Sequence, residues 1–428
     1  NWMQVDGGAL ATNFTTLTVG TGGGAQYNSL TITNGGRFFS SGAVSLGAAS
    51  SSNNTITVAG LNDDQPAVWS AGGQTLSLGV GTASGNMLKI GNGGILTNVL
   101  VSFTVPTPDN ALVVENGGQA YAGLSIGGTN VVNPSITVSG VSLWEPGSDW
   151  NAGGRSLGVG ETAGSIGGLM TLNGRTFSSF TTVRVGYGAG TRDHRLVLTN
   201  SAKLYATGAG NIGYTTAAGT NNAVLVLGGA GASTLWNNGG GALTVGAGAS
   251  TNSSLIIDGQ DAAELGSAAL ENFGALSVGG TASSSVLLTN RASFFSVSGN
   301  TTLNGTSNRI EVVKGSKMSV YVGAYDTGPK IGNLCNLLRV SGSNSVLEGR
   351  GAAGGNKLAV SESNNAVRIE EGGLVTNMNV VLGSSAAAVG NLLSITGGGK
   401  LYSFSAASYI GGSATAVSNI GLVSGENS

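Results

Sequence analysis

The sequence predicts an all-β protein that folds as a right-handed, single-stranded parallel β-helix, also called a β-solenoid. An alternating apolar strand followed by a glycine pair recurs along the whole chain, as in "MLKIGNGG" (87–94) and "LLSITGGG" (392–399). A further strand pattern, Leu-x-Val/Leu-Gly, follows in most repeats, as in "TLSLG" (75–79) and "ALTVG" (242–246). Self-similarity at a period of roughly 20–50 residues is the signature of solenoids.

The first strand of each coil is the most regular part of the repeat. Stretches with its pattern are 2–10, 29–39, 55–60, 87–96, 111–121, 135–140, 169–177, 196–205, 223–229, 254–259, 286–295, 309–318, 337–344, 366–375, 392–402 and 420–425. They predict about 16 coils of ~27 residues with three strands each. Apolar residues at i and i+2 should point inward, with Thr, Ser or Asn between them facing water. Only "SAALENFGAL" (267–276) is typical of a helical turn.

The glycine pairs are predicted to form the corners between strands. Glycine adopts a positive φ without steric cost, and a sharp bend requires one. The corner residues we expect are Gly35, Gly36, Gly93, Gly94, Gly117, Gly118, Gly372 and Gly373.

Asparagine recurs just before the next first strand. The clearest corner positions are Asn86, Asn110, Asn222 and Asn391, and Asn28, Asn308, Asn333, Asn365 and Asn419 follow the same rule. Asparagine tolerates the left-handed region, and stacked asparagines can form hydrogen bonds from coil to coil. We therefore expect an asparagine ladder along one corner.

Every third or fourth coil has a variant second side, which carries tryptophan at 58–79, 138–158 and 226–246 but not at 340–360. The residues concerned are Trp69, Trp144, Trp150 and Trp236. A glycine pair follows them, and a third strand comes next. We interpret these tryptophans as packing anchors rather than as platforms for sugars.

Composition excludes several classes of protein. The chain has 428 residues, 76 glycines, 40% hydrophobic residues, 9% charged residues and a net charge of −2. Glycine follows no collagen period, and the aliphatic content argues against disorder. No basic patch could neutralise a phosphate backbone, so no nucleic-acid partner is expected. No stretch reaches the roughly 18 apolar residues of a membrane span. No linker interrupts the repeats, which predicts a single domain over 1–428.

Candidate chemistry is sparse. Cys335 and His194 are the only residues of their types, which excludes an intramolecular disulfide, a cysteine-rich metal site and multi-histidine metal sites. We expect Cys335 to be a small core residue. Asp63-Asp64, Glu370-Glu371 and "TRDHR" (191–195) gather charge, but neighbouring coils add no matching carboxylate. The sequence thus predicts no enzyme, no catalytic residue, no cofactor and no metal site, with isolated Ca²⁺ at Asp63, Asp64 or Asp109 only weakly supported.

The repeats resemble the passenger regions of bacterial autotransporters, above all autotransporter-associated β-strand repeats. The motifs that carry this resemblance are "LKIGNGG" (88–94), "LTITNGG" (30–36), "SLGVG" (156–160) and "LSVGG" (276–280). The resemblance implies secretion, an extracellular or cell-surface location, and a role in adhesion or structure. The sequence shows no membrane-barrel domain, autochaperone segment or sorting signal. It opens with "NWMQVDGG", without a signal region, which suggests a processed or excised segment.

The expected function is a structural one. Neither end has a polar cap, so the terminal coils could stack head to tail into a fibre, sheath or filament. The residues expected at these assembly ends are Trp2, Met3, Val5, Ile420 and Leu422. The main expected partner is therefore another copy of the same chain. An adhesin or glycan-binding stalk is the alternative, with glycans or cell-surface polysaccharide as partners, and a polysaccharide-degrading enzyme is a weaker third.

Overall fold

The computed structural model confirms an all-β solenoid of stacked parallel strands. It describes residues 1–103, 109–115, 117–126, 135–139, 149–161, 163–174, 176–215, 218–229, 233–260, 267–321, 330–331, 335–350, 357–386, 388–403, 408–411 and 415–428. In this part of the chain no helix is long and apolar enough to cross a membrane. Two compact units, Asn1–Ala206 and Thr207–Ser428, are described separately below. A single domain over 1–428 stays a prediction.

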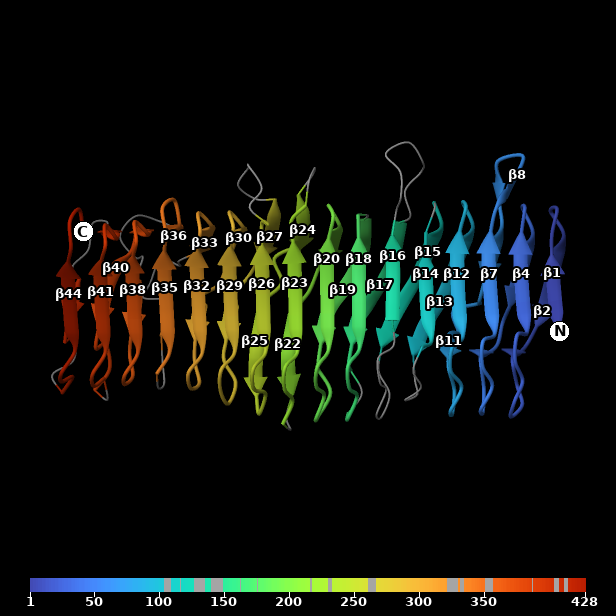
Figure 1. Ribbon diagram of the computed structural model, residues 1–428, viewed down its shortest axis with the longest axis horizontal. Coiled ribbons are helices and arrows are strands. Elements are labelled where there is room, and N and C mark those ends of the chain that lie inside the picture. The colour runs from blue at the N-terminus through green and yellow to red at the C-terminus, as the bar shows by residue number, and fades with distance from the viewer. Residues whose placement is uncertain are drawn as a thin grey trace. The chain divides into compact units, whose positions relative to one another are not determined.

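In the unit Asn1–Ala206, the first strands of successive coils form one parallel sheet. Its order is β1 (Trp2–Val5), β4 (Ser29–Thr33), β7 (Thr55–Ala59), β12 (Met87–Gly91), β14 (Ala111–Val114), β16 (Ser135–Ser139), β18 (Leu169–Asn173) and β20 (Arg195–Thr199). Figure 1 shows these strands side by side, from β1 in blue to β20 in green. Each coincides with a stretch expected to be a first strand.

The second and third strands of these coils form a second sheet. It contains β2 (Leu10–Phe14), β3 (Leu17–Val19), β5 (Arg37–Ser40), β6 (Val44–Leu46), β10 (Val68–Ser70), β11 (Thr75–Leu78), β13 (Ile95–Phe103), β15 (Gln119–Ile126), β17 (Asp149–Val159), β19 (Thr176–Val185) and β21 (Lys203–Ala206). The long strand β13 pairs with both β10 and β11, so there the expected second and third strands are continuous.

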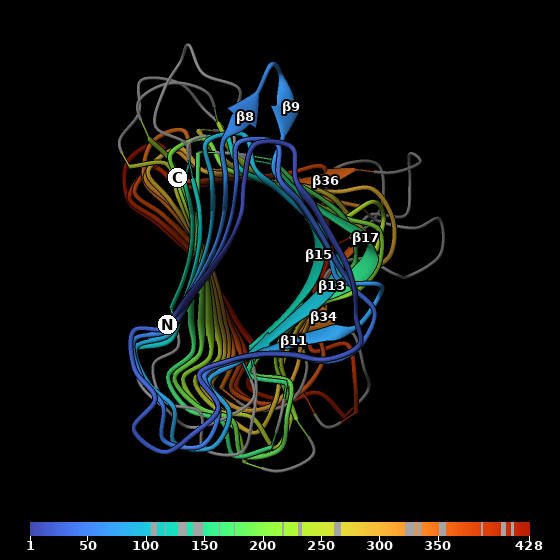
Figure 2. The same ribbon diagram turned by 90° about the vertical axis from the view of Figure 1, so that its right-hand side faces the viewer.

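One short hairpin interrupts this pattern. Strands β8 (Leu61–Asn62) and β9 (Gln65–Pro66) pair antiparallel, and Asp63 and Asp64 form the turn between them. Figure 2 shows the hairpin projecting beyond the neighbouring corners.

The unit Thr207–Ser428 repeats the same plan. Its first sheet has the order β23 (Ala223–Leu227), β26 (Ser254–Asp258), β29 (Ser285–Thr289), β32 (Arg309–Val313), β35 (Leu337–Ser341), β38 (Ala366–Glu370), β41 (Leu392–Thr396) and β44 (Ile420–Ser424). These strands too coincide with the expected stretches.

Its second sheet contains the remaining strands. They are β22 (Gly210–Thr215), β24 (Thr234–Asn237), β25 (Leu243–Gly248), β27 (Ala268–Phe273), β28 (Leu276–Val278), β30 (Ser293–Ser296), β31 (Thr301–Leu303), β33 (Lys317–Tyr321), β34 (Lys330–Ile331), β36 (Val346–Arg350), β37 (Lys357–Val360), β39 (Leu374–Thr376), β40 (Asn379–Leu382), β42 (Lys400–Tyr402) and β43 (Tyr409–Ile410). Strands β27 and β28 occupy the stretch typical of a helical turn, so that expectation is wrong. Packing in the sheet outweighs the local preference.

The core consists of aliphatic side chains stacked from coil to coil. In the first sheet, Leu30 pairs with Ile56 and Ile56 with Leu88, and all three are buried. The residues between them are partly exposed, as the period of two requires. Each coil covers the apolar side chains of its neighbours, so the core is continuous along the stack and no single coil forms a core by itself.

The number of complete coils is slightly lower than the expected sixteen. Strand β44 opens a coil, but the described residues after it, 425–428, add no second or third strand. The spacing between coils also varies. Corner asparagines that bond to each other lie 26, 32 and 24 residues apart in three successive steps. Corner loops of different length absorb this variation while the strands stay in register.

Candidate functional site

The two glycines of each corner have different roles. The first has a left-handed backbone, with φ of +76° at Gly35, +79° at Gly93, +78° at Gly117 and +80° at Gly372. Asn34, the residue before Gly35, has a left-handed backbone as well, with φ of +47°. Two successive left-handed residues make a type I′ turn, which is a sharp bend of the kind expected at the glycine pairs.

The second glycine of each pair is needed because the backbones of two coils come close together there, and it has no positive φ. The expectation of a positive φ is therefore wrong for Gly36, Gly94, Gly118 and Gly373. A methyl group there would overlap a backbone carbonyl of an earlier coil: that of Val5 for Gly36, Val58 for Gly94, Ile90 for Gly118 and Val340 for Gly373. These positions let one coil touch the next backbone to backbone.

The expected asparagine ladder is present in the first unit. The Asn28 Nδ2 atom donates to Asn54 Oδ1 at 2.8 Å, and Asn54 Nδ2 donates to Asn86 Oδ1 at 2.9 Å. The Asn86 Nδ2 atom then donates to Asn110 Oδ1 at 2.9 Å. Asn1 adds an exposed rung, since its Nδ2 lies 3.2 Å from Asn28 Oδ1. Asn54 had not been expected in the ladder.

The second unit carries the same ladder in its later coils. The backbone N–H groups of Asn308, Asn336, Asn365 and Asn391 donate to the side-chain oxygens of Asn336, Asn365, Asn391 and Asn419, respectively. Asn222 is fully buried at the corresponding place before β23. The expected Asn333 lies outside the described residues, and Asn336 holds the position immediately before β35.

The glycine that ends the third strand makes room for this ladder. Methyl groups on Gly20 and Gly47 would overlap the side chains of Asn54 and Asn86, respectively. The Leu-x-Val-Gly motif and the corner asparagine are therefore two halves of one packing arrangement. Sequence reasoning found both motifs but not their link, because they are far apart along the chain.

His194 takes a ladder position immediately before β20. Its Nδ1 atom accepts the backbone N–H of Gly168 at 3.0 Å, and its Nε2 atom lies 3.0 Å from the Ser165 hydroxyl. Burial lowers the pKa of His194, while a hydrogen bond to the Ser165 backbone and the Asp193 carboxylate raise it by less. The ring thus replaces an asparagine amide in the fold.

Three of the four tryptophans that we interpreted as anchors are described, and all are fully buried. Trp69 Nε1 donates to the Ser40 hydroxyl at 3.2 Å, and Trp150 Nε1 donates to the Ala122 carbonyl at 2.6 Å. Trp236 packs edge-on against Phe273, with ring centroids 5.2 Å apart. Their interpretation as packing anchors is confirmed, and Trp144 lies outside the described residues.

At the open edge of the first unit, the expected residues face two ways. Met3 and Val5 pair with the buried Leu30 and Ile32, so they lie in the inward row. Val5 is already buried and Met3 is 37% exposed, whereas Trp2 pairs with Ser29 on the outer face and is 76% exposed.

At strand β44 the expected Ile420 and Leu422 lie in the outward row, since they pair with Leu392 and Ser394. Val423 pairs with the buried Ile395 and is 63% exposed, so it is the apolar residue that this edge leaves without cover. The sequence pattern missed Val423 because it did not fix which residues of the last strand face inward.

The acidic pairs serve the fold. The Arg339 Nε atom lies 2.6 Å from Glu370 Oε1, and Arg339 also reaches Glu311 at 3.5 Å. The Ser341 hydroxyl donates to Glu371 at 2.7 Å. Asp63 and Asp64 form the β8–β9 turn, and the described residues hold no group of three potential metal ligands. Cys335 is exposed with φ of +59°, so its expected core position is wrong.

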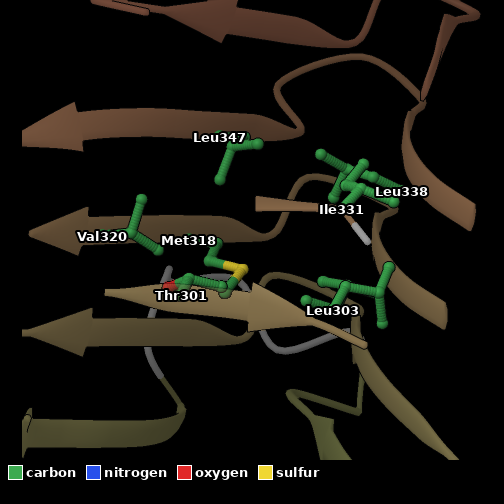
Figure 3. Close-up of a pocket in the computed structure, with 8 residues that line it drawn as sticks. Thr301, Leu303, Met318, Val320, Ile331, Leu338 and Leu347 are labelled. Atoms are coloured by element: carbon green, nitrogen blue, oxygen red, sulfur yellow. The ribbon is translucent and has the colours of Figure 1, made fainter. Parts of the chain in front are cut away.

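One cavity lies inside the solenoid of the second unit. Its lining includes Thr301, Leu303, Met318, Ile331 and Leu347 (Figure 3). Its volume is about 10 Å³, which leaves space for one water-sized sphere at most. We therefore regard it as a packing defect rather than as a ligand site.

A larger hollow of about 630 Å³ lies on the outer face of the second sheet in the same unit. It is lined by Glu271, Asn272, Ser293, Phe294, Phe295, Lys317, Ser319, Glu348 and Arg350. Lys317 forms an ion pair with Glu348 at 2.9 Å, and the Arg350 guanidinium lies 4.0 Å from the Phe295 ring centroid. Sequence reasoning missed this site because it joins four coils.

Comparisons with models of protein families, with curated proteins and with solved structures found no match. The resemblance to autotransporter-associated repeats therefore stays a prediction.

Proposed function

We propose that the chain is an extracellular structural β-solenoid that assembles with itself through its open sheet edges. The observation that carries this proposal is the repeated in-register pairing of first strands, with the buried asparagine ladder beside it. Both features add similar contacts from one coil to the next, so they favour growth along one direction. Structural fibres and sheaths grow in this way, by adding similar units along one direction.

The surface supports the same proposal. Only 9% of the residues are charged and the net charge is −2, so electrostatic repulsion between copies is weak. The outward positions carry short polar residues instead, such as Thr31 and Thr57 in adjacent first strands. A location outside the cell follows as part of the proposal, because a fold held by many repeated hydrogen bonds suits that environment.

The two edge strands offer the contact surfaces. Within the described residues β1 and β44 each pair with one strand, β4 and β41, and a strand edge of this kind is a template for another parallel strand. At β1 the inward Met3 is partly exposed, and at β44 the inward Val423 is largely exposed. A matching coil on either edge would bury these apolar side chains.

The second sheet adds a geometric condition. Among the described residues, β42 and β43 each pair with one strand, β39 and β40 respectively, and β44 extends the first sheet. Tyr402, Tyr409 and Ile410 on these strands are all more than half exposed. A continuous solenoid therefore needs a chain segment that covers β42 and β43, whichever polypeptide supplies it.

Sedimentation velocity and negative-stain microscopy of the purified chain test this proposal. We expect concentration-dependent multimers or filaments for the wild-type protein. The Val423→Lys variant should remain monomeric, since it places a charge in the inward row of an edge. Thr31→Lys adds the same charge to an outward position of an interior strand, and this control should still assemble. Single particles at every wild-type concentration would refute self-assembly.

A second candidate function is a glycan-binding stalk, which the outer hollow beside Phe295 favours. The same hollow gives less support to a polysaccharide-degrading enzyme. Burial raises the pKa of Glu348, but bonds and charge from Lys317, Ser319 and Arg350 outweigh this and lower it overall. Acid catalysis of glycoside cleavage requires a carboxyl group that stays protonated instead.

A further inference from the structure

The outer hollow in the second unit is built by successive coils in register. Phe295 on β30 pairs with Ser319 on β33, and Ser319 pairs with Glu348 on β36. On the neighbouring row, Ser293 pairs with Lys317. Because these side chains alternate in length, the two serines leave a depression between Phe295, Lys317 and Glu348. Parallel strands lie about 4.8 Å apart, so a ligand lying across the coils would meet one row after another.

The walls of the hollow combine hydrogen-bonding groups with an aromatic ring. The side chains of Glu271 and Asn272 form no hydrogen bond within the described residues and are free to bind a ligand. The Phe295 ring is held by the Arg350 guanidinium at 4.0 Å, which limits its motion. The site thus offers acceptors, an amide and an apolar surface together.

The charges in the hollow balance. Lys317 and Glu348 neutralise each other at 2.9 Å, and the Ser319 hydroxyl also donates to Glu348 at 3.1 Å. One carboxylate, Glu271, and one guanidinium, Arg350, remain. A site with this balance has no net attraction for a polyanion or a polycation, and it favours a neutral ligand rich in hydroxyl groups.

We propose that this hollow binds a short segment of a neutral oligosaccharide, with its hydroxyl groups on Glu271 and Asn272 and its apolar face against Phe295. The volume of about 630 Å³ lies within the range of roughly 300–1,000 Å³ found for small-molecule sites. This inference rests on the second candidate function, the glycan-binding stalk, and is separate from the structural role, because self-assembly uses the sheet edges and not the outer sheet face.

An array of neutral, anionic and cationic glycans tests the proposal with the labelled full chain. We expect binding to neutral glycans, and titration calorimetry with the strongest neutral tetrasaccharide then gives the affinity. Phe295→Ala and Glu271→Gln should each weaken binding about tenfold, since each removes one of the three proposed contacts. Glu271 is exposed, so the Glu271→Gln variant keeps the fold.

Phe39→Ala is the matched control. Phe39 is another outward phenylalanine under an arginine, with Arg37 at 5.6 Å from its ring, but it lies outside the hollow. Its removal should leave the affinity unchanged. Binding to no neutral glycan, preference for charged glycans, or equal loss in Phe39→Ala would each overturn the proposal. Assembly of the same preparations, seen by microscopy, reports separately on the structural role.

Discussion

The side-chain oxygen of Asn86 accepts two hydrogen bonds from Asn54, one from the backbone N–H at 3.1 Å and one from Nδ2 at 2.9 Å. Asn86 repeats the arrangement toward Asn110 with its own N–H and Nδ2 groups. Each amide thus satisfies a backbone donor that the corner would otherwise leave buried without a partner. Asparagine suits this position because its side chain is both donor and acceptor.

Replacing one asparagine of the ladder should show how much the ladder contributes to stability. We expect Asn86→Ala to reduce the free energy of unfolding by about 2–4 kcal/mol, since the buried N–H and Nδ2 of Asn54 lose their acceptor. Amide hydrogen exchange at Asn54 provides the local measurement and should accelerate. Asn1→Ala removes an exposed rung and should change stability by less than about 0.5 kcal/mol. Unchanged exchange at Asn54 would show that the ladder adds nothing.

The corner pair Gly372-Gly373 separates the two roles of glycine. A methyl group on Gly372 meets nothing closer than 3.6 Å, so Gly372→Ala should cost only the left-handed strain, about 1–2 kcal/mol. Gly373→Ala should cost more, because its methyl group would overlap the Val340 carbonyl group and force the coils apart. Thermal unfolding of both variants measures the difference. A larger loss for Gly372→Ala would reverse the assignment.

The regular part of this fold could be predicted because it depends on local pattern. The apolar alternation of "LKIGNGG" (88–94) and its relatives locates the first strands, since the period of two and the turn glycines are visible within one repeat. The link between Gly47 and Asn86 could not be predicted, because it depends on which residues become neighbours after stacking. Loop length sets that, and it varies between coils.

The same reason explains what was missed at the surface. Glu271 and Arg350 lie 79 residues apart in the sequence, and only the coil-to-coil register brings them to one hollow. Cys335 was misplaced for a related reason. The apolar residues that follow it suggest a strand, but the strand begins at Leu337 and Cys335 lies in the turn before it.

Stability should depend on pH through His194. The pKa of its ring is lowered by burial, so the unfolded state binds the proton more tightly. Stability is then constant above the unfolded pKa of about 6.5 and falls as the pH drops through the lower folded value. Protonation would also place an N–H at Nδ1 against the Gly168 N–H that Nδ1 now accepts.

Melting temperatures measured between about pH 7.5 and pH 5 test this dependence. His194→Asn restores the usual ladder residue and should flatten the profile in that range. An identical pH profile for the wild type and His194→Asn would assign the loss to other groups.

The three buried tryptophans should respond differently to the same substitution. Trp69 and Trp150 each donate a hydrogen bond through Nε1, to Ser40 and to Ala122, whereas the Nε1 atom of Trp236 has no acceptor among the described residues. Trp150→Phe removes that bond and leaves a buried carbonyl group, which should cost about 1–3 kcal/mol beyond the loss of volume. Trp236→Phe removes an unpaired donor, so it should cost clearly less.

Chemical denaturation of the two variants, with hydrogen exchange in the adjacent strands, measures which substitution lowers the free energy of unfolding more. The Phe273 ring that contacts Trp236 at 5.2 Å can pack equally well against phenylalanine, so the aromatic stack itself survives the change. Equal destabilisation of Trp150→Phe and Trp236→Phe would mean that ring volume, and not the hydrogen bond of Nε1, decides how each tryptophan holds its coil.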